Sequence, residues 1–219
     1  MQELHAEIIQ ESGDEAGASC IRKKCIAQGS LDPHTYVNEA KYLEKTSNAD
    51  EAIIVLEGAL SQGVHDDYVI AVLAKFYDEK NDGGSRGSML RMKEIKNGSC
   101  NAVFYSDEIK WLRDIKRTNE AIELYSLATK RNAMSPHVIS NYSKALQVAG
   151  RGEEASRIRM DHIDKGSNEP ALFNDEALWQ MEQNHIGRAD KLMRLARERG
   201  AFDAYSESVM LKIEKRHRC

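Results

Sequence analysis

The stretch PHVISNYSKALQVAGRGEEASRIRMDHIDKGSNE, residues 136–169, decides the fold, because its layout recurs about every 34 residues along the chain. Apolar residues over 138–149 return at intervals of three and four, which places them on one stripe of a helix. Gly150 and Gly152 interrupt that pattern, and a second apolar run extends over 155–163. One unit is therefore predicted to be a hairpin of two helices.

Two columns of residues show the recurrence. The first is a small residue early in the second helix, and the second is a residue that closes that helix in a left-handed conformation. Both columns advance in steps of 34, 35, 34, 34 and 34. The columns are Ala18, Ala52, Gly87, Ala121, Ala155 and Ala189, and Gly29, Gly63, Gly98, Asn132, Gly166 and Gly200. The three prolines of the chain, Pro33, Pro136 and Pro170, stand where first helices begin. Six hairpins follow.

This layout resembles the tetratricopeptide repeat (TPR) family, whose unit is a 34-residue helix-turn-helix. Further matches are a second small residue seven positions after the first, at Ala59, Ala128 and Ala196. The resemblance implies an all-α, right-handed α-solenoid of antiparallel helix hairpins, with about six TPR-like repeats and a C-terminal capping helix. The glycine that closes most units is similar to the related pentatricopeptide repeats, but their period is longer.

The unbroken period predicts one repeat domain over 1–219, since each unit of such an array packs only on its neighbours. Residues 1–32 form an N-terminal capping hairpin in this interpretation, 33–199 form five repeats, and 200–219 form a capping helix. The repeats are expected at about 33–62, 67–97, 102–131, 136–165 and 170–199. The single 35-residue step falls in the second of them, where residues 81–88, NDGGSRGS, are predicted to be a mobile loop between its helices.

Composition narrows the function classes. Charged residues make up 30% and hydrophobic residues 41% of the 219 residues, which suits a soluble, helix-rich protein. The net charge of −4 argues against a general nucleic-acid binder. No span of about 20 apolar residues and no leader pattern is present, so a cytoplasmic location is expected. The histidines and four cysteines show no metal-site or catalytic spacing. We therefore expect no enzyme activity, no cofactor and no bound metal.

One column of the first helices is basic. It reads Lys41, Lys75, Lys110, Lys144, Leu178 and Lys212, and we call its five lysines the lysine column. In the TPR family the first helices line the concave groove, so the resemblance implies a ladder of positive charge there that would attract an extended anionic partner. The alternative is that these lysines are only solvated, or pair with the recurring glutamates Glu39, Glu108 and Glu176.

Three residues before the lysine column, Asn38 and Asn141 carry amides that can hold a peptide backbone through a paired donor and acceptor. The resemblance implies this use, because the family binds extended peptides in its groove. His34 and His137, at the starts of the same helices, are weaker members of the candidate site. The alternative is that all four are ordinary polar residues at helix starts.

The repeats also alternate. Residues 36–42, 105–111 and 173–179 are alike at steps of 69 and 68, so every second unit matches best. Duplication of a pair of repeats would produce this pattern, as would two kinds of unit that meet different parts of one ligand. The aromatic column Tyr42, Phe76, Trp111 and Trp179 is predicted to pack between hairpins rather than to stack on bases or sugars.

These features predict a non-catalytic adaptor or chaperone that binds an extended, acidic segment of a partner protein. Two other classes stay open. One is a pentatricopeptide-like RNA binder, which the acidic net charge disfavours. The other is the assembly or regulatory arm of a larger enzyme system, such as one that makes a surface polysaccharide.

Overall fold

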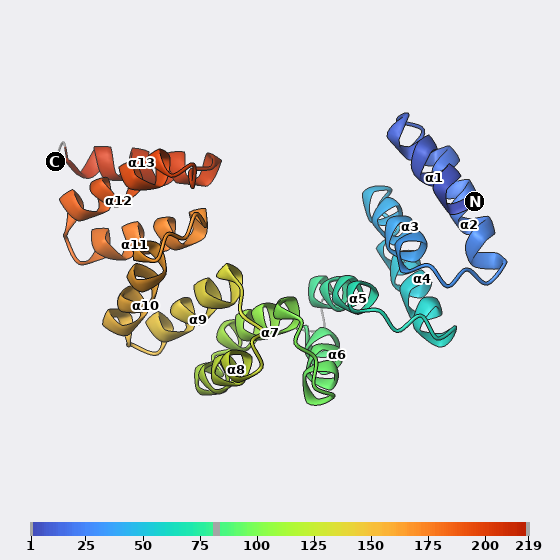
Figure 1. Cartoon of the computed structure of the whole chain (residues 1–219), viewed down its shortest axis with the longest axis horizontal. Coiled ribbons are helices and arrows are strands. Elements are labelled where there is room, and N and C mark those ends of the chain that lie inside the picture. Colours follow the sequence, from blue (N-terminus) through green and yellow to red (C-terminus); the bar gives the residue numbers. More distant parts are fainter. Residues whose placement is uncertain (1, 81–83, 218–219) are drawn as a thin grey trace. The chain divides into compact units, whose positions relative to one another are not determined.

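The computed structural model describes residues 2–80 and 84–217, and every element in those ranges is an α-helix (Figure 1). The contacts divide the chain into two compact units, Met1–Ser99 and Cys100–Cys219. The N-terminal unit contains α1 (Gln2–Glu11), α2 (Glu15–Ala27), α3 (Pro33–Lys45), α4 (Ala49–Ser61), α5 (Asp67–Glu79) and α6 (Ser85–Lys96). The C-terminal unit contains α7 (Ala102–Asp114), α8 (Thr118–Lys130), α9 (Pro136–Val148), α10 (Gly152–Asp164), α11 (Pro170–Glu182), α12 (Ile186–Glu198) and α13 (Ala204–His217).

Each expected hairpin is present, with ends within one or two residues of the prediction. Within each unit the second helix of one hairpin packs on the first helix of the next, as α2 does on α3 and α10 on α11. First helices also contact first helices, as in the pairs α3 and α5, α7 and α9, and α9 and α11. The first helices of each unit therefore form one layer and the second helices another.

The small-residue column is the closest point of contact between helices. Its five alanines are completely buried. At the sixth position, a Cβ built on Gly87 would lie 2.6 Å from the backbone oxygen of Ala74, so α5 and α6 approach too closely there for an alanine. The prediction that this column is small for packing reasons is confirmed.

The closing column ends the second helices as predicted. Its five glycines and Asn132 all have φ between 56° and 97°, the left-handed region. A second set of left-handed residues lies in the turn inside the hairpins, and there the chain uses Ser47, Lys116 and Asn184 as well as glycine. A side chain in this region costs energy, so these turns are strained where the sequence lacks glycine.

The helix starts are also specified locally. Pro33, Pro136 and Pro170 occupy the first turns of α3, α9 and α11, where a missing N–H costs nothing. The Asp32 side chain accepts hydrogen bonds from the backbone N–H groups of the first turn of α3, and Ser135 does the same for α9.

A buried polar cluster joins the first two hairpins of the N-terminal unit. Glu39 on α3 is completely buried and accepts hydrogen bonds from Ser19 Oγ at 2.7 Å and from Arg22 Nε at 3.0 Å. Arg22, on α2, also donates to Gln10 Oε1 at 3.0 Å. The cluster therefore ties α1, α2 and α3 together.

The same cluster recurs 137 residues later in the C-terminal unit, the length of four repeats. Glu176 accepts from Ser156 Oγ at 2.7 Å and from Arg159 Nε at 2.9 Å, and Arg159 donates to Gln147 Oε1 at 3.1 Å. Gln180 Nε2 donates to Glu176 at 2.7 Å as well. Arg159 and Glu176 are both completely buried.

These clusters explain why alternate repeats resemble each other. The intermediate first helices have Leu73, Tyr142 and Met210 where Glu39 and Glu176 stand. A glutamate in a first helix therefore accompanies an arginine in the preceding second helix. Arg91 and Glu108 occupy the corresponding middle positions and are also buried; Arg91 pairs with Asp78 at 2.6 Å. The alternation therefore has a packing cause, and two kinds of ligand contact are not needed to explain it.

The predicted loop over 81–88 is wrong in its second half. Helix α6 begins at Ser85, so residues 85–88 are helical, and Gly87 packs against α5. Residues 81–83 lie outside the described part of the chain. The single domain over 1–219 stays a prediction, since the two units are described separately.

Candidate binding surface

All five residues of the lysine column occupy the same position in their helices. Each of its lysines is the ninth residue of its helix: Lys41 on α3, Lys75 on α5, Lys110 on α7, Lys144 on α9 and Lys212 on α13. All are exposed except Lys144, which is half-buried. Within each unit, the amines of the lysine column therefore lie on the solvent-exposed surface of the first helices.

In the N-terminal unit the predicted residues form a ridge along α3. His34, Asn38 and Lys41 follow at intervals of four and three, so they share one helix face. Lys41 Nζ donates to Tyr68 Oη at 2.6 Å, and the His34 and Tyr68 ring centroids are 5.6 Å apart. The structure thus brings His34 and Lys41 together through Tyr68 of α5.

Sequence reasoning did not single out Tyr68. It is the second residue of α5, the position that His34 and His137 hold in α3 and α9. Inspection of the second residue of each first helix, for a side chain long enough to reach the lysine of the preceding first helix, would have found Tyr68.

Asn38 and Lys41 also line a small cleft of about 90 Å³ in this unit, together with Tyr42 and Lys45. Lys45 Nζ pairs with Glu15 at 2.7 Å at its edge. The cleft is too small for a side chain of a partner, but it leaves the Asn38 amide beside an amine that faces no carboxylate among the described residues.

Lys75 has a different environment. Its Nζ lies 3.4 Å from Glu44 and 3.5 Å from Glu79. Partial burial acts to lower the pKa of Lys75, but the charges of Glu79 and Glu44 and their hydrogen bonds outweigh it, so the pKa is raised. This amine is therefore held in its charged form and is largely neutralised by its neighbours.

In the C-terminal unit, too, one lysine of the column pairs with a carboxylate and the others do not. Lys144 Nζ lies 3.0 Å from Asp175, which also accepts from Ser140 Oγ at 2.9 Å. Lys110 and Lys212 are exposed and form no ion pair within the described residues. His137 is exposed at the start of α9.

Asn141 is already engaged. Its Nδ2 donates to Ser106 O at 3.1 Å and to Ser106 Oγ at 3.0 Å, so it fastens α9 to α7. Arg113 Nη1 donates to its oxygen at 3.4 Å. Binding of a peptide backbone by this amide would require these contacts to open.

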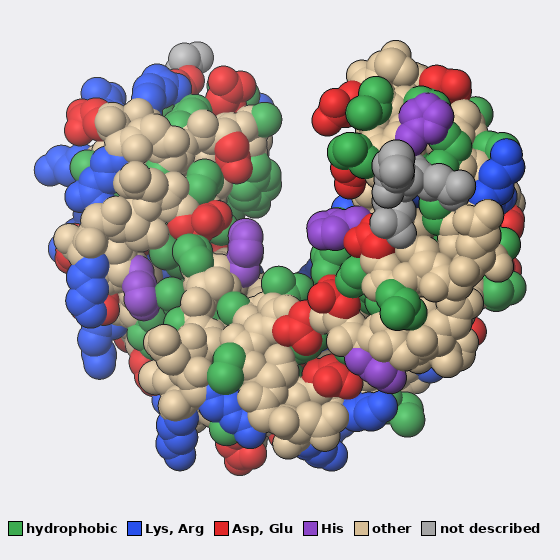
Figure 2. Space-filling view, turned by 45° about the vertical axis from the view of Figure 1, so that its right-hand side comes forward, with side chains coloured by type: hydrophobic (Ala, Val, Ile, Leu, Met, Phe, Trp, Pro, Cys, Tyr) green, Lys and Arg blue, Asp and Glu red, His purple; other side chains and the backbone are tan. Residues whose placement is uncertain are grey.

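The glutamates Glu39 and Glu176 do not neutralise the lysine column. Both are buried and bound to Arg22 and Arg159, so that part of the alternative interpretation is wrong. Lys75 and Lys144 are neutralised by other carboxylates. Both acidic and basic side chains appear on the face that Figure 2 shows.

Other chemistry finds little support in the described residues. They contain no group of three or more His, Cys, Asp or Glu side chains able to hold a metal ion. None of the described helices is both long and apolar enough to cross a bilayer. Phe76 and Trp179 of the aromatic column are more than nine-tenths buried, in agreement with their predicted packing role.

Solved structures show the same arrangement of hairpins. A tetratricopeptide repeat protein from Parabacteroides merdae matches with a TM-score of 0.78 over 99% of this chain and 86% of its own, at 14% identity. The chain has the tetratricopeptide repeat fold. Yeast Tom70 matches this chain with a TM-score of 0.73 over 98% of it and 46% of Tom70, at 14% identity. Pseudomonas aeruginosa pilF matches with a TM-score of 0.61 over 85% and 84% of the two chains, at 16% identity.

Comparison of sequences adds no family assignment. No protein-family model matches the chain, and no curated protein matches it. The likeness to TPR proteins therefore rests on the fold and on the repeat pattern.

Proposed function

We propose that this chain is a non-catalytic adaptor or chaperone that binds an extended, acidic segment of a partner protein on its first-helix layer. The observation that carries the proposal is the lysine column, because α3, α5, α7, α9 and α13 each have a lysine as their ninth residue. Within each unit, neighbouring first helices with cationic side chains at the same level suit a ligand that runs across those helices.

Not every lysine contributes equally in this proposal. Lys41 and Lys110 are exposed and lack a carboxylate partner within the described residues, so a ligand carboxylate can approach them at no cost in internal ion pairs. Lys75 and Lys144 would have to exchange Glu44 and Asp175 for the ligand. The amines without a carboxylate partner therefore supply most of the attraction, and Asn38 and His34 supply hydrogen bonds beside Lys41.

The magnitude expected of each contact is modest. An exposed ion pair contributes about 0.2–1 kcal/mol, so reversal of two lysines should weaken binding by about tenfold. The attraction should also weaken as salt screens it, because the screening length is only about 8 Å at physiological ionic strength.

The test is affinity capture from a lysate of the source cells with the Lys41→Glu/Lys110→Glu variant and the unchanged chain. The matched control is Lys93→Glu/Lys130→Glu, which makes the same change in charge at two exposed lysines of second helices. We expect one or more proteins that the unchanged chain and the control retain and that the first variant loses.

Three results would overturn the proposal. Equal retention by both variants would show that the lysine column is not the binding surface. Loss of the retained material on nuclease treatment would favour an RNA ligand. Retention of a catalytic subunit, independent of both variants, would favour the assembly arm of an enzyme system.

A further inference from the structure

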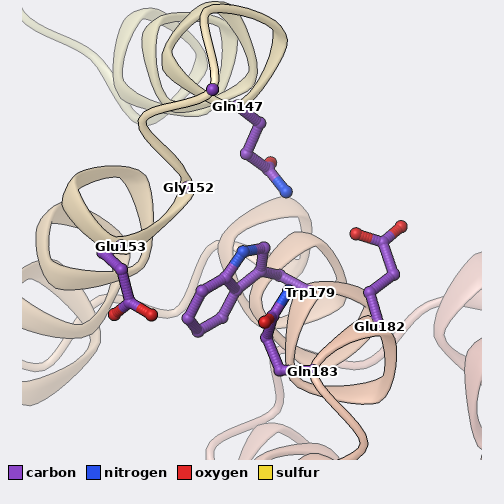
Figure 3. Close-up of a pocket in the computed structure, with 7 residues that line it drawn as sticks. Gln147, Gly152, Glu153, Trp179, Glu182 and Gln183 are labelled. Atoms are coloured by element: carbon purple, nitrogen blue, oxygen red, sulfur yellow. The ribbon is translucent and has the colours of Figure 1, made fainter.

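A pocket of about 360 Å³ opens in the C-terminal unit where the α9–α10 turn faces the end of α11 (Figure 3). It lies at the ends of these helices and includes none of the lysine column. Its lining residues are Gln147, Gly150, Gly152, Glu153, Trp179, Glu182 and Gln183.

Trp179 forms the floor of the pocket and offers an unused donor. Its side chain is only 7% exposed, and its indole N–H has no hydrogen-bond partner among the described residues. A Cβ on Gly152 would lie 2.8 Å from Nε1, so the glycine keeps the edge of the indole uncovered. The side chain as a whole is buried, but its N–H faces the pocket, where water or an acceptor group of a ligand can reach it.

The walls of the pocket are acidic. Glu153 on α10 and Glu182 on α11 approach it from opposite sides, and neither forms an ion pair within the described residues (Figure 3). Gln147 uses its oxygen for Arg159, and its amide nitrogen points into the pocket in Figure 3. The pocket therefore presents two carboxylates and two N–H donors.

The N-terminal unit contains the corresponding site 137 residues earlier, and there the chain supplies the cation itself. The corresponding residues are Gln10 for Gln147, Glu15 for Gly152, Tyr42 for Trp179 and Lys45 for Glu182. Lys45 Nζ pairs with Glu15 at 2.7 Å, and the cleft is only about 90 Å³. In the C-terminal unit the lysine has become a glutamate, and the glycine has enlarged the space.

We propose that this pocket binds an arginine or lysine side chain of a partner protein. The ligand's cation would lie between Glu153 and Glu182, where Lys45 lies in the other unit, and a backbone carbonyl would accept from the Trp179 indole and the Gln147 amide. The two donors favour a peptide over a free polyamine, which has no acceptor. This site is independent of the lysine column and would take a segment of opposite charge.

The test uses the indole ¹H–¹⁵N signals of the full chain, of which there are two, since the chain contains two tryptophans. The Trp111→Phe variant assigns the Trp179 signal. The probes are acetyl-Gly-Arg-Gly-amide, its lysine counterpart, and the citrulline peptide, which keeps the shape of arginine without its charge. We expect the Trp179 signal to shift with saturation for the two cationic peptides, and about tenfold weaker binding of the citrulline peptide.

Variants test whether the shift of the Trp179 signal arises from binding in this pocket. Glu153→Gln/Glu182→Gln should weaken the arginine peptide by about tenfold, and Glu182→Lys, which restores the arrangement of the N-terminal unit, should abolish the shift. The control Glu154→Gln removes a neighbouring charge that pairs with Arg151 and does not line the pocket, so binding should be unchanged.

Three results would overturn the proposal: no saturable shift with either cationic peptide, an equal response to the citrulline peptide, or tighter binding of spermidine than of both peptides. If Trp111→Phe does not fold, the unchanged chain still decides the matter, because one of its two indole signals must respond and must stop responding in Glu182→Lys.

Discussion

The buried cluster around Glu176 makes a sharp prediction about stability. Glu176 accepts three hydrogen bonds, from Ser156, Arg159 and Gln180, and only one of them comes from a charged group. Arg159 donates to Glu176 and Gln147, and its Nη2 is buried without a hydrogen-bond partner. The arginine therefore depends on the glutamate more than the glutamate depends on the arginine.

Single substitutions should reflect this asymmetry. Glu176→Leu leaves a buried guanidinium with one neutral partner, so we expect a loss of about 4–5 kcal/mol in the free energy of unfolding. Arg159→Met leaves a carboxylate that keeps two neutral hydrogen bonds, so we expect about 3 kcal/mol. The double variant removes both charges and replaces them with apolar groups, and it should lie within about 2 kcal/mol of the unchanged chain.

The measurement is urea unfolding followed by far-ultraviolet circular dichroism for the four proteins, with the free energies combined in a double-mutant cycle. The coupling energy should be about 4 kcal/mol or more. Additive effects of the two substitutions, or a larger loss for Arg159→Met than for Glu176→Leu, would refute this view of the cluster.

Three further predictions concern turns and titration. Lys116 holds φ at 64° in the α7–α8 turn, so Lys116→Gly should raise the free energy of unfolding by about 1 kcal/mol in urea unfolding, and a loss of stability would contradict the strain. Burial, with the hydrogen bond and charge of Glu57, raises the pKa of Tyr77 to about 12. Because the folded state holds this proton more tightly, its contribution to stability is complete below pH 10, the ordinary tyrosine value, and is lost as pH rises towards 12. Difference titration of tyrosinate absorbance against Tyr77→Phe should show the late step, and a step near 10 would contradict it. Hydrogen bonds from Ser206 hold the pKa of Asp203, which caps α13, below its usual range. The ionised carboxylate therefore stabilises the folded state fully above the ordinary carboxyl pKa, and this contribution is lost as pH falls through the lowered pKa. Asp203→Asn should therefore make the free energy of unfolding depend less on pH in the acid range, and an unchanged dependence would contradict the role of the cap.

Much of the fold follows from the sequence because the rules that fix it are local. Small residues at a fixed spacing predict close helix contacts, and Gly or Asn at the closing position predicts a left-handed residue. Each predicts the same hairpin independently, and each was confirmed, including Asn132 at φ 56°. The helix ends follow from these signals almost to the residue.

The buried clusters were harder to foresee because they depend on contacts between repeats. In the sequence, Glu39 and Glu176 were visible only as recurring glutamates that could pair with the lysine column. Their partners Arg22 and Arg159 lie 17 residues earlier, on the previous hairpin. A search for residues that recur together every two or four repeats would have paired them.

The candidate site, too, could be predicted only in part from the sequence. The column of lysines is visible in the sequence, and the structure places all five at the same level of their helices. Whether a lysine is neutralised depends on side chains such as Glu44 and Asp175, which come from neighbouring helices and follow no repeat period. The pocket at Trp179 likewise depends on Gly152 at the start of α10, which the sequence analysis interpreted only as an interruption of the helical pattern.

The central claim, that a partner's acidic segment lies on the first-helix layer, is tested most directly by photo-crosslinking. Benzoylphenylalanine would replace His34 or His137, which are exposed on first helices, or the exposed second-helix lysines Lys24 or Lys130 as controls. After capture from lysate, mass spectrometry would identify the cross-linked partner peptide. The account predicts cross-links from positions 34 and 137 to a peptide rich in Asp and Glu, and little or none from the controls. Cross-links mainly from positions 24 and 130, or to a peptide without acidic residues, would contradict it.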